Sequence, residues 1–167
     1  MISSDLSVWL CDLTYTQQSI MAETMPMAIG CIATYLERVI PKVSPVQLFK
    51  YPEKLCDRLD RDGPPDLIGF SNYIWNFNLS YRFAEIIKNI SPNTTSVFGG
   101  PNFSTTLSEQ HIFLAEHPAI DFYIDKDGEI PFAELVTYLQ TDSNPAQLNA
   151  LHPNIYWNGR CREQQVM

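Results

Sequence analysis

The sequence has few basic residues. Eleven lysines and arginines stand against 19 aspartates and glutamates, which gives a formal net charge of −8 at pH 7. A surface of this sign repels the phosphates of nucleic acids and the anionic headgroups of membranes. Neither a nucleic acid nor a membrane surface is therefore an expected partner.

Signals for secretion and membrane insertion are also missing. The first basic residue is Arg38, so the chain lacks the basic segment that opens a secretory signal. No apolar run approaches the roughly 20 residues that a membrane-spanning helix needs. These absences predict a cytoplasmic protein.

Motifs for metal binding and for common enzyme chemistry are absent as well. The four cysteines lie far apart, and none belongs to a CxxC pair or lies within a few residues of a histidine, so we expect reduced thiols and no zinc or iron–sulfur site. There is no GxSxG, P-loop, GxGxxG or HExxH motif. A nucleophile with a matching base cannot be assigned, so we expect a chain that is not catalytic alone.

What the sequence does contain is enough apolar surface for one folded domain. Hydrophobic residues make up 45% of the 167 residues, and short apolar strands alternate five times with amphipathic helical stretches. The expected strands are 7–13, 45–51, 66–71, 95–98 and 120–124, and the expected helices are 27–40, 52–61, 77–90, 106–117 and 131–141. This pattern predicts a doubly wound, flavodoxin-like or Rossmann-like α/β fold. We expect a five-stranded parallel sheet of order 2-1-3-4-5 with helices on both faces.

The last 26 residues differ from this pattern. Residues 142–153 have the composition of a linker, and residues 154–161 resemble a short hairpin with Asn158-Gly159 as its turn. We therefore expect an α/β domain over residues 1–141, followed by a linker and hairpin tail over 142–167.

Ligands of such folds bind outside the carboxyl ends of the strands. Two features of the segments after the predicted strands suit a ligand. Gly99-Gly100 leaves two positions without a Cβ, although a turn alone would also select glycine there. Aromatic residues also gather in these segments, where they either contact a flat ligand or fold back over the helix ends; they are Tyr73, Trp75, Phe77 and Phe103.

Four segments together resemble the N-terminal cobalamin-binding domain that precedes many radical S-adenosylmethionine enzymes. They are residues 25–36 (MPMAIGCIATYL), 65–76 (PDLIGFSNYIWN), 97–102 (VFGGPN) and 121–132 (DFYIDKDGEIPF), and the resemblance covers about residues 6–140. It implies a corrin ring over the strand carboxyl ends and a nucleotide tail that enters the core beside the third and fourth strands. The cofactor-binding residues that it implies are Thr14, Tyr15, Ser71, Asn72, Tyr73, Trp75, Gly99, Gly100, Pro101, Asn102, Phe103, Gly128 and Glu129.

The sequence departs from the family pattern at several points. The DxHxxG segment is absent, so a bound cobalamin would take no axial histidine from this chain. Asn102 follows the GGP segment where the family commonly has histidine, and Lys126 stands in place of a glycine. There is no CxxxCxxC motif, so this chain holds no iron–sulfur cluster, and the resemblance implies a separate radical S-adenosylmethionine domain or protein as its partner.

Three functions follow as hypotheses. The first is a corrinoid carrier that works with a radical S-adenosylmethionine enzyme in methyl transfer or rearrangement. The second is a degenerate domain that has lost the cofactor and acts as a protein-interaction module. The third is a flavodoxin-like flavin carrier, with residues 14–19 as a hydroxyl-rich phosphate loop.

Overall fold

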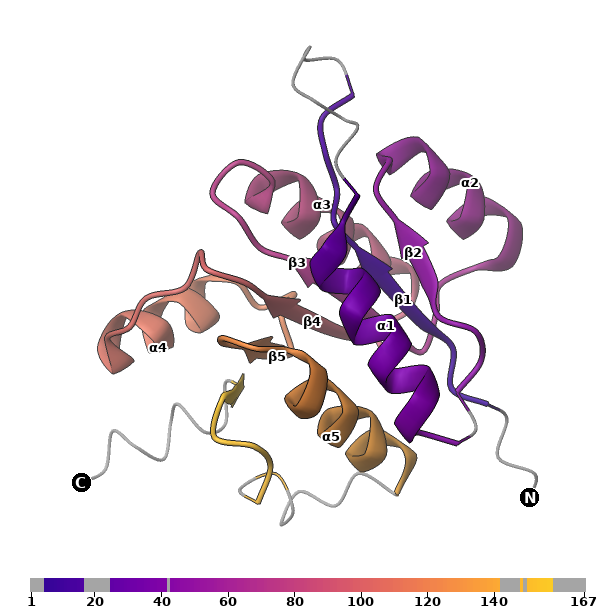
Figure 1. The fold of residues 1–167 in the computed structure, drawn as a ribbon. Helices are drawn as coiled ribbons and strands as arrows, with labels where there is room; N and C mark the ends of the chain where they lie inside the picture. The colour runs from indigo at the N-terminus through magenta and orange to yellow at the C-terminus, as the bar shows by residue number, and fades with distance from the viewer. Residues whose placement is uncertain (1–4, 17–24, 42, 142–147, 149, 158–167) are drawn as a thin grey trace.

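The fold is an α/β sandwich built on one twisted sheet (Figure 1). The computed structural model describes residues 5–16, 25–41, 43–141, 148 and 150–157. The strands are β1 (Val8–Cys11), β2 (Gln47–Phe49), β3 (Leu67–Ser71), β4 (Thr95–Gly99), β5 (Phe122–Ile124) and β6 (Ile155–Trp157). The helices are α1 (Met27–Val39), α2 (Pro52–Asp62), α3 (Phe77–Ile90), α4 (Leu107–Glu116) and α5 (Glu129–Gln140).

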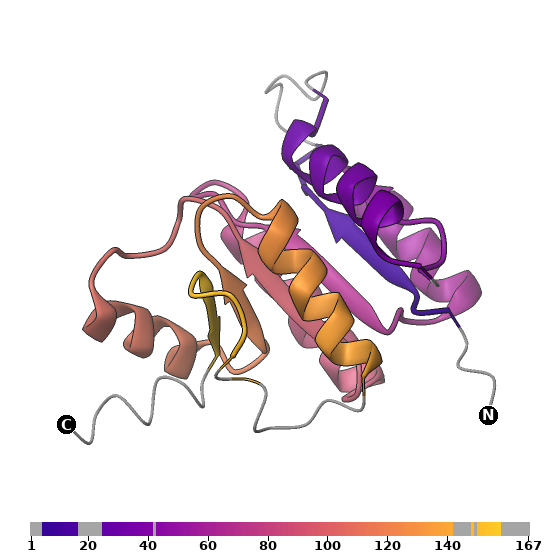
Figure 2. The ribbon, with the colours of Figure 1, turned by 60° about the horizontal axis from the view of Figure 1, so that its bottom comes forward.

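The strands lie in the order β2-β1-β3-β4-β5-β6, and the first five are parallel. The doubly wound architecture and the order of these five strands are confirmed. The expected number of strands is wrong, because β6 adds a sixth that runs antiparallel to β5, with Phe122 opposite Trp157. Figure 2 shows β6 at the edge of the sheet beside β5.

Only the first strand of the expected hairpin lies within the described residues, and it pairs with β5. Ile155 is fully buried and Trp157 is 8% exposed, so their apolar side chains cover the edge of the sheet. The predicted turn Asn158-Gly159 and the return strand lie outside the described residues. The predicted domain boundary at residue 141 stays a prediction.

Helices cover both faces of the sheet. Successive side chains of a strand point to opposite faces, and apolar side chains on both faces must be buried. Val8 and Leu10 of β1 pack with α1 and α5 on one face, whereas Trp9 and Cys11 pack with α2, α3 and α4 on the other. In Figure 1, α1 and α5 lie in front of the sheet. The crossovers from β2 to β3, β3 to β4 and β4 to β5 all run in one direction across the sheet and place α2, α3 and α4 on one face. The crossover from β1 to β2 runs in the other direction and places α1 on the opposite face, as right-handed crossovers between parallel strands require.

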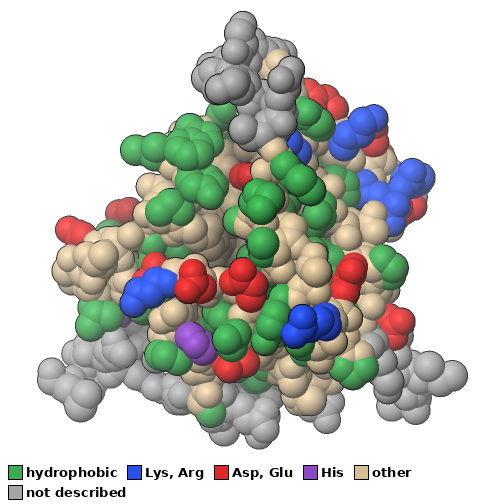
Figure 3. Space-filling model, viewed as in Figure 1, with side chains coloured by type: hydrophobic (Ala, Val, Ile, Leu, Met, Phe, Trp, Pro, Cys, Tyr) green, Lys and Arg blue, Asp and Glu red, His purple; other side chains and the backbone are tan. Residues whose placement is uncertain are grey.

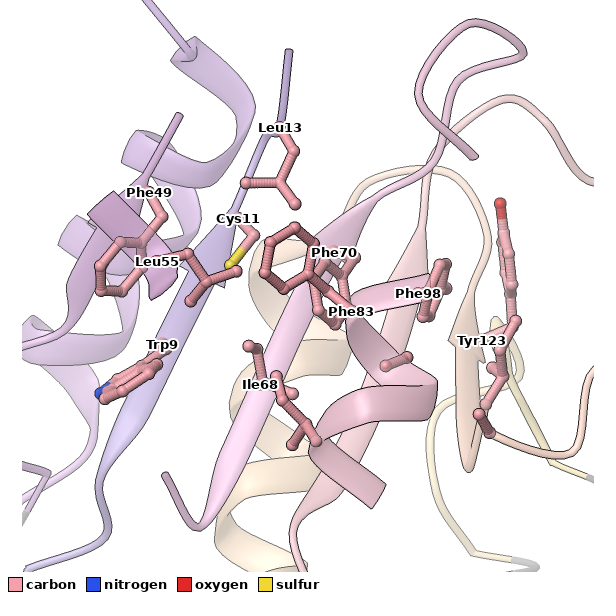
Figure 4. Close-up of a cluster of buried hydrophobic side chains, with 14 of the residues drawn as sticks. Trp9, Cys11, Leu13, Phe49, Leu55, Ile68, Phe70, Phe83, Phe98 and Tyr123 are labelled. Carbon is pink, nitrogen blue, oxygen red and sulfur yellow. The ribbon is translucent and has the colours of Figure 1, made fainter. Parts of the chain in front are cut away.

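The core behind the sheet is the more aromatic of the two (Figure 4). Phe70 of β3 and Phe98 of β4 lie side by side, with ring centroids 5.1 Å apart. Cys11 is fully buried in this cluster, and burial raises the pKa of its thiol well above the usual value. A thiol with so high a pKa stays protonated and unreactive, so Cys11 is a core residue, as the sequence predicts.

In the described part of the chain, no helix has both the length and the apolar character needed to cross a bilayer. The cytoplasmic location expected from the sequence stays a prediction.

Candidate functional site

A cavity of about 200 Å³ lies on the face covered by α1 and α5, at the carboxyl ends of the strands. Its inner walls are apolar and come from β1, β3, β4 and α5; they include Leu10, Gly69, Val97 and Phe132. The cavity lies near the point where the strand order reverses. The chain passes from β1 through α1 to β2 on one side of β1, and then returns to β3 on its other side. The topology therefore produces a crevice at this point before any side chain is considered.

Gly69 controls how closely the helices approach the sheet. A Cβ at this position would lie 2.7 Å from Leu10 Cδ2 and 3.3 Å from Phe132 Cε2. Leu10 and Phe132 therefore fill the space above β3 that any other residue would need. A glycine inside an apolar strand is the sequence signal for such close packing.

Ser71 ends β3 and lines the cavity. Its hydroxyl donates a hydrogen bond to Asp12 Oδ1, in the loop that follows β1. With its proton used in this way, the Ser71 oxygen keeps free lone pairs for a donor on a ligand. The backbone of Asp12 is held in place as well, because its N–H donates a hydrogen bond to the Phe49 carbonyl at 2.8 Å.

Asn72 follows Ser71 but turns away from the cavity. It is fully buried, and its Nδ2 donates to the Asn102 carbonyl at 3.1 Å and to the Tyr123 hydroxyl at 3.0 Å. Its Oδ1 accepts a hydrogen bond from Asn102 Nδ2 at 3.1 Å. The side chains of Asn72 and Asn102 thus hold each other, so they position the segment after β4 and do not line the cavity.

The tight turn at Gly100 depends on the same residues. Gly100 has a φ of +127°, and a Cβ there would lie 2.8 Å from the Asn72 carbonyl oxygen. The Tyr123 hydroxyl donates to the Gly100 carbonyl at 2.9 Å, which fixes the turn from β5. Backbone conformation alone therefore requires glycine at position 100, while Gly99 and Gly100 both also line the cavity.

The predicted aromatic group divides into two parts. Tyr73 lines the cavity and stacks on Trp75, with ring centroids 4.4 Å apart and planes 9° from parallel. Trp75 is 63% exposed. Phe103 instead stacks on Tyr123, with ring centroids 3.8 Å apart, and Phe77 packs on Phe113, with ring centroids 5.4 Å apart. Phe103 and Phe77 thus fold back against the core behind the sheet. The stacked Tyr73–Trp75 pair is therefore the aromatic surface that remains near the cavity.

Three further predicted residues lie away from the cavity. The N–H of Thr14 donates to the Lys50 carbonyl at 3.1 Å, which directs this loop toward β2, and Tyr15 beside it is exposed. Pro101 lines a separate shallow depression against α4 with Asn102 and Phe103. The rest of the predicted loop after β1, residues 17–24, lies outside the described part of the chain.

The turn between β5 and α5 forms the mouth of the cavity. Gly128 and Glu129 line it as the resemblance implies, and Lys126 and Asp127 line it beside them. The first turn of α1 contributes Ile29 from the other side. Figure 3 shows this face, where acidic and hydrophobic side chains lie close together near the centre.

The described residues that line this cavity are apolar apart from Ser71, Tyr73 and the charged residues Lys126, Asp127 and Glu129. They include no group of three histidines, cysteines, aspartates or glutamates that could hold a metal ion. Burial raises the pKa of Tyr123 well above that of a free tyrosine, so its hydroxyl stays a neutral donor. The arrangement is that of a binding site.

The chain belongs to the family of B12-binding domains, since the model of the B12 binding domain matches residues 18–136. Two curated relatives show which proteins carry similar sequence. The chain is 30% identical over 116 residues to 2-(S-pantetheinyl)-carbapenam-3-carboxylate methyltransferase from Streptantibioticus cattleyicolor, a match over 67% of this chain and 16% of that protein. It is 29% identical over 122 residues to the cobalamin-dependent radical SAM methyltransferase TokK from Streptomyces tokunonensis, over 71% of this chain and 17% of the relative.

A solved structure has the same fold. The cobalamin-dependent S-adenosylmethionine radical enzyme OxsB, with aqua-cobalamin and S-adenosylmethionine bound, superposes with a TM-score of 0.62 at 17% identity. The match covers 83% of this chain and 19% of that one. The chain thus spans less than a fifth of the length of these proteins.

Proposed function

We propose that this chain binds cobalamin in the cavity between α1, α5 and the sheet, and holds it for a radical S-adenosylmethionine enzyme. The observation that carries the proposal is the position of the cavity. It opens at the carboxyl ends of β3 and β4, beside Ser71 and Gly99, where the resemblance implies that the nucleotide tail enters the core. The membership of the chain in the B12-binding domain family supports the same ligand.

The size of the cavity supports insertion of one limb of the cofactor. Pockets that enclose a drug-sized ligand usually measure about 300–1,000 Å³. A cavity of about 200 Å³ is smaller than these and much too small for a corrinoid, but its apolar walls suit a flat aromatic base. The nucleotide base would lie among Leu10, Val97 and Phe132, and the corrin ring would lie over the mouth.

The surface around the mouth suits a large, partly apolar ligand. We define the exposed apolar rim as Met27, Ile74, Trp75 and Ile130, which are 66%, 83%, 63% and 54% exposed. These residues belong to the segments that line the cavity or adjoin them. Exposed apolar side chains that gather around a cavity mark a surface that a ligand or partner covers. The corrin ring and the radical S-adenosylmethionine partner would cover the rim together.

No axial histidine from this chain is expected in the bound state. The described residues that line the cavity include no histidine. Bound cobalamin would supply the alkyl-carrying cobalt chemistry, whereas the residues of this chain would bind and orient the cofactor. The reaction and its substrate would belong to the partner.

The test is an anaerobic titration of the protein with hydroxocobalamin, followed by calorimetry and by absorbance between about 300 and 600 nm. We expect saturable binding near one to one with a spectral shift. Gly99→Val should weaken it, since the Cβ of residue 99 would lie 3.1 Å from the Ile124 carbonyl oxygen and the added methyl groups would narrow the cavity. Ala115→Val on the exposed side of α4 is the matched control.

Absence of binding to folded protein would overturn the proposal. The two other hypotheses would then be tested directly. A flavin carrier would take up flavin mononucleotide and turn yellow, and an interaction module would keep its protein partners without any cofactor. No feature of the described residues favours either over cobalamin.

A further inference from the structure

Lys126 has an unusual backbone conformation for a lysine. Its φ is +63°, and it is the only residue other than glycine with a positive φ in the part of the chain that the structure describes. This left-handed region favours glycine, because a Cβ crowds the following carbonyl oxygen. The turn from β5 to α5 therefore carries a long side chain at a position where glycine would be less strained.

The side chain belongs to the mouth of the cavity. Lys126 is exposed there, and it is the one cation among the described residues that line the cavity. Its ammonium forms no ion pair with the described carboxylates. Its backbone N–H is held by Asp125 Oδ1 at 2.9 Å, which fixes the turn and not the ammonium.

The charges around Lys126 decide which ligand groups the mouth accepts. Asp127 and Glu129 also line it, so without Lys126 the mouth would carry two negative charges and no positive charge. An anionic ligand group would then be repelled. With Lys126 present, and with the positive end of α5 beginning at Glu129, an anion has one cationic partner at this point.

A complete corrinoid carries one such anion. Its nucleotide loop joins the corrin ring to the base through a phosphodiester, whereas the other side chains of the ring are neutral amides. If the base occupies the apolar cavity and the ring lies over the rim, the phosphodiester must cross the mouth. We propose that Lys126 binds this phosphodiester, so the chain selects corrinoids with a complete nucleotide loop over cobinamides, which lack it. This inference rests on the proposed function.

The experiment compares three ligands by calorimetry: hydroxocobalamin, diaquacobinamide and cobinamide phosphate. The variants are Lys126→Gln, which keeps length but removes charge, and Lys126→Gly, which also suits the left-handed backbone. Lys54→Gln, at a 73% exposed position on α2, removes the same charge far from the cavity and serves as control. Circular dichroism and thermal unfolding of each variant establish that it is folded.

We expect both Lys126 variants to bind hydroxocobalamin about five- to twentyfold more weakly, and diaquacobinamide as the unaltered protein does, within about twofold. Cobinamide phosphate should lose affinity along with hydroxocobalamin. Raising the salt concentration should weaken hydroxocobalamin binding more in the unaltered protein than in Lys126→Gln. Lys54→Gln should change none of these values.

Two results would overturn the inference while leaving the proposed function intact. In one, the Lys126 variants bind hydroxocobalamin and diaquacobinamide with equal losses, which would assign Lys126 a structural role. In the other, they bind hydroxocobalamin as well as the unaltered protein does. If the unaltered protein binds neither ligand, the proposed function itself fails.

Discussion

The hydroxyl of Ser71 donates a hydrogen bond to the carboxylate of Asp12 across the point where the strand order reverses. Ser71 ends β3, and Asp12 directly follows β1, so one side-chain contact joins the two strands that flank the crevice. The bond also orients the Ser71 oxygen at the wall of the cavity. Binding at this site should therefore depend on both residues, but to different extents.

Ser71→Ala should weaken hydroxocobalamin binding about three- to tenfold. The change removes from the cavity wall an oxygen that would accept a hydrogen bond from the ligand, and one such neutral bond contributes about 0.5–1.5 kcal/mol. It also leaves the Asp12 carboxylate without its donor. Asp12→Asn keeps an acceptor oxygen and should weaken binding less. Calorimetric titration measures both effects. Ser104→Ala, whose hydroxyl bonds the exposed Glu109 carboxylate instead, is the control; equal losses in it would contradict a specific role for Ser71.

Tyr123→Phe should destabilise the fold by about 1–3 kcal/mol, because it leaves the Gly100 carbonyl unpaired and removes one partner of Asn72 Nδ2. Urea unfolding followed by circular dichroism measures the loss. Tyr15→Phe, which removes a hydroxyl from an exposed ring, should change stability by less than about 0.5 kcal/mol. If both variants unfold at a similar urea concentration, the buried hydroxyl contributes nothing to the stability of the fold.

The same hydroxyl should make stability fall in alkaline solution. Burial raises the pKa of Tyr123 in the folded state, whereas a tyrosine in the unfolded chain ionises near pH 10. Above pH 10 the unfolded state therefore releases a proton that the folded state keeps, and stability declines by up to about 1.4 kcal/mol per pH unit. Below pH 10 the hydroxyl keeps its proton in both states, so the contribution of Tyr123 to the free energy of unfolding is complete. Urea unfolding between pH 8 and 11 should show a smaller decline in Tyr123→Phe, and parallel declines would refute the assignment.

Trp75→Ala should weaken hydroxocobalamin binding about fivefold or more, since an exposed indole stacked on Tyr73 offers a flat apolar surface beside the mouth. Trp75→Phe keeps an aromatic ring and should retain most of the affinity. The matched control is Ile112→Ala, which shortens a 56% exposed apolar side chain on α4. Equal affinity of Trp75→Ala and the unaltered protein would remove the Tyr73–Trp75 pair from the site.

Much of the fold could be predicted from the sequence because its elements are set by local patterns. Apolar periodicity and the breaks at glycine and proline locate five strands and five helices within a few residues of their observed positions. The sequence predicts an extended segment at 154–157 as part of a hairpin, but not its pairing with β5, in which Ile155 lies opposite Ile124, 31 positions earlier in the chain. A pairing over such a distance leaves no local signal.

The residues predicted to form the site lie at one edge of the sheet, but only some of them line the cavity. Residues at the carboxyl ends of the strands do converge, and Ser71, Tyr73 and the Gly99-Gly100 pair line the cavity. Asn72 and Phe103 lie at the same edge but bond and stack with Tyr123, which follows in the next strand. Which neighbour a rim residue contacts depends on tertiary packing, and no spacing in the sequence gives that information.

Gly69 offers the sharpest test of how the cavity is built. Gly69→Ala should destabilise the fold by about 1–3 kcal/mol, because the new Cβ would lie 2.7 Å from Leu10 Cδ2 and 3.3 Å from the Phe132 ring. Adding Leu10→Val removes the nearest methyl group and should restore part of the loss. Gly30→Ala in α1 is the matched control: its Cβ would meet no atom within 4 Å, and alanine in a helix should stabilise by about 0.5–1 kcal/mol. Urea unfolding should therefore shift in opposite directions for the two substitutions. A shift in the same direction would mean that Leu10 and Phe132 do not close tightly over β3.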